Sequence, residues 1–314
     1  MIVTLTPNPS VDRTIEIDAL VRGAVIRAKA VHVDASGKGV NVARALVANG
    51  VKARAVLPSG GAEGAQLAAL IAEEGIETTT VPVAMPVRAN VTVVEPDGTT
   101  TKLNEPGPVL DVDEVEALVA ATIAASRGAS WLACCGSLPP GAPPDLYARL
   151  AASLRDAGVK VAVDSSGPAL AAAVDAGPAL VKPNDEELAE VTGMRIETIG
   201  DVIAAAGELR RRGVGTVLAS LGRNGALLVD ADGAVHGSST VIRPRSTVGA
   251  GDALLAGFLA AGGAGRQALA EGLAWGAAAV SLPGTQMPTP ADLDRSAVSL
   301  HDHPDVDRPL GGSS

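Results

Sequence analysis

Aromatic residues are scarce in this sequence, since phenylalanine, tyrosine and tryptophan make up 1% of its 314 residues. A nucleic-acid surface built on stacked aromatic rings is therefore not expected. The formal net charge of −10 also opposes binding to polyanions, so any phosphate must be held by a few local lysine and arginine side chains. Small phosphorylated ligands remain compatible with this composition.

Cysteine is also rare, and the two residues present, Cys134 and Cys135, are adjacent in an apolar run. Neighbouring cysteines do not form the framework of a disulfide-rich secreted fold, so a reducing compartment is favoured. The first residues, Met1 to Thr6, lack a basic region before an apolar stretch, which indicates a strand rather than a signal peptide. No uninterrupted apolar run is long enough to span a bilayer. We therefore expect a soluble cytoplasmic protein with no membrane or nucleic-acid partner.

Apolar residues account for 47% of the chain and are spread evenly, which gives no reason to divide it into independent domains. Short apolar runs alternate with longer helical patterns, as is typical of a parallel sheet with crossover helices. The pattern predicts an α/β fold with a doubly wound, mainly parallel sheet, in one domain over residues 1–300. The expected strands are Ile2–Leu5, Ala53–Leu57, Ala129–Cys134, Val159–Val163, Ala179–Val181 and Thr216–Ser220, and a helix is expected at Gly39–Ala48.

Two segments, residues 13–33 and 87–103, break this rhythm because they alternate apolar and polar residues without helical spacing. We interpret them as an antiparallel β-sheet lid over the carboxyl ends of the main strands, where doubly wound sheets bind ligands. The alternative is a pair of hairpins without a function. The polar segment at residues 301–314 is predicted to be disordered.

The glycine-rich runs do not match the common phosphate-binding motifs. At Gly249-Ala250-Gly251, Leu254 stands where the dinucleotide fingerprint has its third glycine. The run Ser36-Gly37-Lys38-Gly39 is not a P-loop, because glycine instead of serine or threonine follows the lysine. No G-x-S-x-G elbow occurs in the chain.

Residues 247–252 form a glycine turn that opens an apolar helix at Ala253–Ala260. Free backbone N–H groups at a helix start stabilise negative charge, and small residues let a phosphoryl group approach the backbone. Asp252, in the first turn, can then accept a hydroxyl proton beside a transferring phosphate. The same acid can instead cap the helix, and this motif alone does not choose between the two roles.

The sequence resembles the ribokinase/PfkB family of carbohydrate kinases, and the motifs occur in family order over nearly the whole chain. They are Thr6-Pro7-Asn8-Pro9-Ser10-Val11-Asp12, Gly37-Lys38-Gly39-Val40-Asn41, Gly136-Ser137-Leu138-Pro139-Pro140-Gly141, Val181-Lys182-Pro183-Asn184, Ser220-Leu221-Gly222 and Ser246-Thr247-Val248-Gly249-Ala250-Gly251-Asp252. Within the family they look most like the branch of 1-phosphofructokinase, tagatose-6-phosphate kinase and the minor 6-phosphofructokinase. The resemblance implies a ribokinase-like fold and the phosphorylation of a ketohexose phosphate by ATP with Mg²⁺.

The resemblance also implies a role for each matching residue. Asp252 would be the catalytic base, and Gly249, Ala250 and Gly251 would form an anion hole for the γ-phosphoryl group. The sugar phosphate would be bound by Asp12, Gly37, Lys38, Gly39, Asn41, Arg88 and Ser137. ATP would be bound by Lys182, Asn184, Glu187, Ser220, Gly222, Gly225, Thr247, Gly249 and Gly251, with Glu187 also reaching Mg²⁺ through water.

Lys38 and Arg88 carry the inference that the sugar is already phosphorylated. A sugar without a phosphate needs no cation at this place, whereas a lysine and a forked arginine together neutralise a dianion. Taken separately, each would be assigned to the solvated surface. Asp12 is expected to accept hydrogen bonds from sugar hydroxyls, and capping of the preceding turn is the alternative.

The loop Asn104-Glu105-Pro106-Gly107 looks most like 1-phosphofructokinases. Fructose 1-phosphate is therefore the expected substrate and fructose 1,6-bisphosphate the product, with tagatose 6-phosphate or fructose 6-phosphate as alternatives. Ser36 and Cys135 depart from the glycine and the serine that are common in relatives. A non-catalytic regulator that binds nucleotide or sugar phosphate is a competing class, which the retained Asp252 disfavours. An exposed apolar face of the lid would give the chain a surface for a homodimer.

Overall fold

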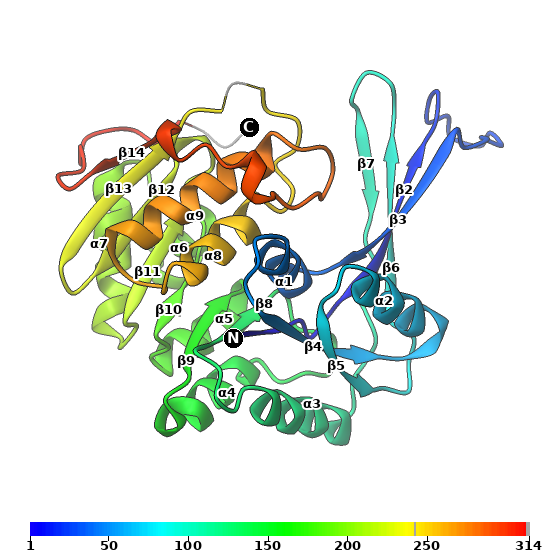
Figure 1. Ribbon diagram of the computed structural model, residues 1–314, viewed down its shortest axis with the longest axis horizontal. Helices are drawn as coiled ribbons and strands as arrows, with labels where there is room; N and C mark the ends of the chain where they lie inside the picture. The colour runs from blue at the N-terminus through cyan, green and yellow to red at the C-terminus, as the bar shows by residue number, and fades with distance from the viewer. Residues whose placement is uncertain (242, 312–314) are drawn as a thin grey trace.

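Figure 1 shows the computed structural model, which describes residues 1–241 and 243–311. In these residues the main sheet has ten strands, in the order β14-β13-β12-β11-β10-β9-β8-β1-β4-β5. Its parallel strands are β1 (Ile2–Leu5), β4 (Ala53–Ser59), β5 (Glu77–Pro82), β8 (Trp131–Cys135), β9 (Lys160–Asp164), β10 (Leu180–Val181) and β11 (Thr216–Ser220). An antiparallel edge follows, made of β12 (Ala226–Asp230), β13 (Gly233–Ser239) and β14 (Val298–His301). The predicted fold class is confirmed.

Helices cover both faces of this sheet, as crossover connections between parallel strands require. One core packs beneath α3 (Val112–Ala125), α4 (Leu146–Leu154), α5 (Gly167–Asp175), α6 (Asp185–Thr192) and α7 (Ile199–Arg211). The other packs beneath α1 (Lys38–Ala48), α2 (Gly61–Glu73), α8 (Ala250–Ala260) and α9 (Gly265–Val280). Because successive side chains of a strand point to opposite faces, Val3 belongs to the first core and Ile2 to the second. No helix in the described part of the chain is long and apolar enough to cross a membrane.

The boundaries of the elements near the expected site shift slightly from the sequence-based ones. Strands β1 and β11 have the expected bounds, whereas β9 reaches one residue further and ends at Asp164. Helix α8 begins at Ala250 because Gly249 is its N-cap residue. Gly249 has φ 80°, a left-handed conformation that favours glycine. Asp252 is therefore the third residue of α8, within its first turn.

A second sheet stands out from the body of the molecule beside α2 (Figure 1). It has the order β3-β2-β6-β7 and consists of β2 (Ser10–Glu16), β3 (Ala30–Ser36), β6 (Arg88–Val94) and β7 (Thr100–Leu103). We expected antiparallel pairing, which is found in β2–β3 and β6–β7, but the central pair β2–β6 is parallel. Since β2 and β6 continue the parallel strands β1 and β5 beyond their carboxyl ends, they leave the main sheet in the same direction.

The part of the predicted tail that the structure describes, residues 301–311, makes specific contacts with the rest of the chain. His301 pairs with His236 between β14 and β13, and the two rings stack with centroids 6.2 Å apart. Further on, the N–H of Ile199 donates to the Arg308 carbonyl over 3.0 Å, and the N–H of Leu310 donates to the Glu197 carbonyl over 2.8 Å. This contact forms because the first N–H groups of α7 have no acceptor within the helix. The rest of the predicted tail, residues 312–314, lies outside the described residues.

Candidate active site

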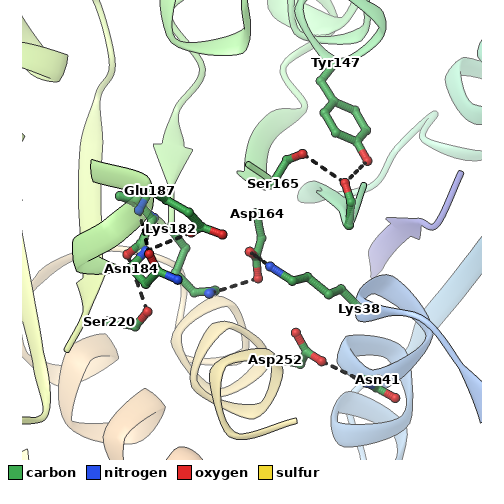
Figure 2. Close-up of polar contacts among 12 residues, drawn as sticks. Lys38, Asn41, Tyr147, Asp164, Ser165, Lys182, Asn184, Glu187, Ser220 and Asp252 are labelled. Carbon is green, nitrogen blue, oxygen red and sulfur yellow. Dashed lines mark hydrogen bonds and ion pairs between the residues drawn. The ribbon is translucent and has the colours of Figure 1, made fainter. Parts of the chain in front are cut away.

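The Asp252 carboxylate is buried between α8 and α1, with 7% of the residue exposed. Its Oδ2 accepts a hydrogen bond of 2.8 Å from Asn41 Nδ2, as Figure 2 shows. Helix α8 has no side-chain cap, so the alternative that Asp252 caps its own helix is contradicted. Burial, together with the negative charge of Asp164, raises the pKa of Asp252 to about 6.

Two lysines from different parts of the chain meet on the buried carboxylate of Asp164 (Figure 2). Lys38 Nζ, from the first turn of α1, donates to Asp164 Oδ1 over 2.7 Å. Lys182 Nζ, directly after β10, forms an ion pair with Oδ2 over 3.0 Å. Burial alone would raise the pKa of Asp164, but the charges of Lys182 and Lys38 hold it below its ordinary value. Asp164 therefore remains ionised at neutral pH.

The same carboxylate fixes the charge of Lys38. Burial alone would lower the pKa of this ammonium group, but the charge of Asp164 and its hydrogen bond hold the pKa above the ordinary value. Lys38 is thus a permanent cation whose Nζ contacts a buried acid. Its side chain is also 39% exposed, so it is partly solvated as well as paired.

The glycine turn before α8 lies next to this cluster. A methyl group added at Gly251 would be 3.4 Å from Lys182 Nζ, so that ammonium group lies against the backbone of the turn. The Ala250 N–H makes a long bond of 3.4 Å to the Thr247 carbonyl, whereas the Gly251 N–H has no backbone acceptor in the described residues. A free N–H group and a lysine ammonium group therefore face the same space near the Asp252 carboxylate. This combination attracts a phosphoryl group.

Asp12 lies on β2 and belongs to a polar cluster of the small sheet. Its Oδ1 accepts hydrogen bonds from Ser10 Oγ over 2.7 Å and from Asn90 Nδ2 over 2.9 Å. The structure gives Oδ2 no partner within the described residues, so this oxygen is left for a ligand hydroxyl. Asp12 bonds to side chains and not to a backbone N–H, which contradicts the interpretation as a turn cap.

Arg88 and Lys38 are not brought into contact. Arg88 begins β6, and its terminal nitrogens donate to the carbonyls of Glu105 and Asn8 over 3.0 and 2.9 Å. Gly37 and Gly39 flank Lys38 at the start of α1, and both pack against the Thr6 side chain so closely that neither position has room for a Cβ atom. Glycine is therefore required there for packing, whatever its contact with substrate.

The residues expected to bind nucleotide gather at the carboxyl ends of β10 and β11. Asn184 and Glu187 form a reciprocal capping box at the start of α6, and Asn184 also pairs with Ser220 in an isolated bridge. Gly222 and Gly225 form a tight turn at positive φ, and Gly225 packs against the Gly237 carbonyl. These contacts explain the residues structurally and leave their role toward ATP as a proposal.

Ser137 and Thr247 are exposed, and the structure gives neither side chain a hydrogen bond within the described residues. The loop before Ser137 is nevertheless fixed, because the Gly136 carbonyl accepts bonds from Tyr147 Oη over 2.8 Å and from Ser165 Oγ over 2.9 Å (Figure 2). Two cavities of about 430 and 290 Å³ lie along α9 and contain none of the predicted site residues.

Two residues of this site were missed in the sequence. Asp164 ends a buried strand, and the carboxyl end of a parallel strand is where ligand-binding side chains gather, so its position was a usable signal. Asn90 follows Arg88 by two residues on a strand and thus shares its face, but alternation alone did not show that β6 lies beside β2.

Comparison with known proteins identifies the family. The chain matches the pfkB family of carbohydrate kinases over residues 5–292. It is 40% identical to the 1-phosphofructokinase of Rhodobacter capsulatus over 267 residues, which cover 82% of each chain. It is 39% identical to the 1-phosphofructokinase of Haloferax volcanii, covering 93% of this chain and 95% of that protein. It is 35% identical to the ATP-dependent 6-phosphofructokinase isozyme 2 of Escherichia coli, with coverage of 91% and 94%.

The solved structures agree with this result. A crystal structure of Escherichia coli phosphofructokinase-2 in complex with potassium has a TM-score of 0.87 and 34% identity, and the match covers 93% of this chain and 96% of that one. The fold is therefore ribokinase-like, and the site defines a phosphotransferase with an alcohol acceptor. The chain belongs to the pfkB family of carbohydrate kinases.

Proposed function

We propose that this chain transfers the γ-phosphoryl group of ATP to the 6-hydroxyl of fructose 1-phosphate and yields fructose 1,6-bisphosphate. The observation that carries the proposal is the buried Asp252 carboxylate, held by Asn41 close to the lysines that meet on Asp164. The relatives named 1-phosphofructokinase, at 40% and 39% identity, support fructose 1-phosphate as the acceptor. The buried, unpaired Cys134 and Cys135 suit the reducing cytoplasm, where we place the protein.

In the proposed step Asp252 is the general base. It takes the proton of the sugar hydroxyl while the hydroxyl oxygen forms a bond to the γ-phosphorus, and the bond from that phosphorus to the β–γ bridging oxygen breaks to release ADP. A base with a pKa of about 6 is ionised at neutral pH and still accepts a proton effectively. The Gly251 N–H and Lys182 stabilise the negative charge on the transferring group.

On the substrate side, Asp12 binds hydroxyls through Oδ2 and Arg88 binds the phosphate. The proposal keeps Lys38 as a substrate ligand, and its contact with Asp164 supports a position near the reacting end of the sugar. Ser137 and Asn41 line the path between these ends. Fructose 6-phosphate is the second candidate, because relatives at 35% identity are named 6-phosphofructokinase isozyme 2.

The nucleotide is proposed to bind along Asn184, Ser220 and the turn at Gly222 and Gly225. No group of three or more His, Cys, Asp or Glu side chains among residues 1–241 and 243–311 is placed to hold a metal ion. This fits Mg²⁺ that arrives on the phosphates of ATP and keeps most of its waters. Glu187 uses Oε2 in the capping box, so its other oxygen is left for a magnesium-bound water. The ion would neutralise phosphate charge.

A coupled assay of ADP release tests the proposed activity. The purified chain is given fructose 1-phosphate, fructose 6-phosphate, tagatose 6-phosphate and unphosphorylated fructose, each over a range of concentrations. We expect the highest kcat/KM with fructose 1-phosphate and the lowest with fructose. A higher value with either 6-phosphate would refute the sugar assignment, and no turnover with any phosphorylated sugar would refute the proposed function.

The small sheet is proposed to form a homodimer. Its strand register places Ile15 beside Val31 and Val93 on one face, with Leu103 next to them, and Val31 and Leu103 are 53% and 63% exposed. An apolar face of this kind favours a second copy of the same sheet. A solved relative is described as a tetrameric form of Escherichia coli phosphofructokinase-2.

Light scattering should give a dimer for the wild type and a monomer for Leu103→Glu. A monomeric wild type would refute the proposed homodimer.

A further inference from the structure

Arg88 is half buried and has no ion-pair partner in the described residues. Its two terminal nitrogens donate to backbone carbonyls, of Glu105 and of Asn8, and its Nε is buried without a partner. Neutral carbonyls orient the guanidinium group without forming an ion pair, so its charge is offset only through space, by Asp12 and Glu105. In a chain with net charge −10, a partly buried cation without a carboxylate is a site prepared for an external anion.

The charges of two acids, Asp12 and Glu105, act on that guanidinium group, but neither acid forms an ion pair with it in the described residues. Glu105 Oε2 accepts a hydrogen bond of 3.0 Å from the Ala89 N–H, and the Glu105 N–H donates to Asn90 Oδ1 over 3.2 Å. With the bond from Arg88 to the Glu105 carbonyl, the backbone and side chain of Glu105 contact three successive residues of β6. We call these contacts the Glu105 clasp.

The clasp exists because β7 is shorter than β6. The pairing of β6 with β7 runs from Val91 opposite Leu103 to Val94 opposite Thr100, so the Ala89 N–H lies beyond the end of the ladder. The Glu105 carboxylate satisfies this N–H in place of a strand carbonyl. The Glu105 carboxylate, bonded to the backbone in this way, forms no ion pair with Arg88 in the described residues, although its charge acts on the guanidinium group through space.

Asn90 connects the clasp to Asp12. Its Nδ2 donates to Asp12 Oδ1 and to Ser10 Oγ, while its Oδ1 accepts from the Glu105 N–H. The parallel register places Asn90 directly opposite Asp12, and Arg88 opposite Ser10. One network therefore holds Asp12, which is proposed to bind sugar hydroxyls, and the Arg88 guanidinium group at a fixed separation.

We infer that Glu105 is a specificity-determining positioning residue, whose clasp keeps Arg88 unpaired and at a set distance from Asp12, so that the site selects a sugar bearing a phosphate. The inference rests on the proposed function and deepens it. A phosphorylated sugar gains the charge-assisted bonds of a guanidinium group that is already oriented. An unphosphorylated sugar leaves that cation unsatisfied and gains nothing from the clasp.

Three variants test the inference. Glu105→Ala removes the carboxylate and loosens the loop, whereas Glu105→Gln keeps an oxygen that can accept from the Ala89 N–H. The matched control is Glu95→Ala, since Glu95 directly follows β6 and also accepts a backbone N–H bond, from Leu20 over 2.9 Å. Each protein is assayed with ATP and with the sugar phosphate that the wild type prefers, and separately with the unphosphorylated ketose.

Glu105→Ala should raise KM for the sugar phosphate about tenfold while kcat stays within about twofold. The KM for ATP and the kcat/KM for the unphosphorylated sugar should not change, so the preference for the phosphorylated sugar should fall about tenfold. Glu105→Gln and Glu95→Ala should behave like the wild type. A merely structural role would lower kcat/KM for both sugars alike.

An unchanged preference in Glu105→Ala would overturn the inference, as would a Glu105→Gln variant as impaired as the alanine one. Because the sugar is chosen by the wild type's own preference, an error in the sugar assignment leaves this test valid. If the wild type acts on no sugar phosphate, the proposed function and the inference both fail. If the wild type prefers a sugar phosphate and Glu105→Ala keeps that preference, the inference alone fails.

Discussion

Asn41 Nδ2 donates to Asp252 Oδ2 over 2.8 Å and thereby joins α1 to α8 across 211 positions of the chain. The bond fixes the direction of the carboxylate and leaves its other oxygen for the reacting hydroxyl. Asn41 Oδ1 is buried without a hydrogen-bond partner in the described residues. One amide group thus aligns the carboxylate of the proposed base.

Asp252→Asn should lower kcat about a thousandfold, because the amide cannot accept the hydroxyl proton. The KM values should change little, since asparagine has the size and shape of aspartate. Its amide oxygen can still accept the hydrogen bond from Asn41 Nδ2. Steady-state kinetics measures the effect. The control is Asp145→Asn, an exposed aspartate at the start of α4 that makes no side-chain cap and should have wild-type activity. Wild-type turnover in Asp252→Asn would refute the base.

The pH dependence of kcat/KM should report the pKa of Asp252. A base works when deprotonated, so activity should rise with pH through a midpoint of about 6. Burial and the charge of Asp164 raise this pKa, whereas the bond from Asn41 and the charges of Lys38 and Lys182 lower it. In Asp164→Asn a raising charge is lost and both lysines are left unpaired, so the midpoint should shift to lower pH. A midpoint that stays in place or rises would contradict the proposed electrostatics.

Lys38→Met should shift the same midpoint in the opposite direction, to higher pH, because a charge that lowers the pKa of Asp252 is removed. It should also raise KM for the sugar phosphate by about tenfold or more, through the loss of a cation from the substrate site. Pre-steady-state and pH-dependent kinetics separate the two effects. Lys52→Met, an exposed lysine outside the site, is the control and should alter neither quantity.

Gly263→Ala should destabilise the fold more than Gly265→Ala. The two glycines have nearly equal φ values, 72° and 73°, so both substitutions incur a backbone strain of about 1 kcal/mol. A Cβ atom at position 263 would also overlap the Trp131 ring, whereas nothing lies within 4 Å of one at position 265. We expect the free energy of unfolding to fall by about 1–3 kcal/mol more for Gly263→Ala than for Gly265→Ala, as measured by urea unfolding. Equal decreases in the two variants would show that the Trp131 ring moves freely aside.

Much of the fold follows from local patterns in the sequence. The buried strands β1 and β11 are apolar runs bounded by turn residues, and their bounds match the prediction. The parallel β2–β6 pair was not predictable in this way, because alternation identifies a strand but not its neighbour or direction. The contacts of the tail were not predictable for a related reason. Its polar composition gave no sign that the backbone of residues 306–310 bonds to the start of α7.

The site residues show the same difference between what local sequence patterns predict and what depends on the fold. Asp252, Lys38 and Lys182 carry motif positions and were identified, while their common partner Asp164 was not. A motif reports residues that are close in sequence, whereas the Asp164 cluster combines three separate segments whose meeting depends on the sheet order. Glu105 was noticed only as part of a loop, since its contacts with β6 depend on where β7 ends.

The position of β1 also affects how the protein is made. This first strand lies between β4 and β8, and Ile2 shares its core with α8 and α9, the last long helices of the chain. On the ribosome, the apolar face of α1 therefore emerges early and stays uncovered until nearly the whole protein has been translated. We therefore expect nascent chains to benefit from chaperones during that interval, and a product truncated before residue 250 to aggregate instead of folding.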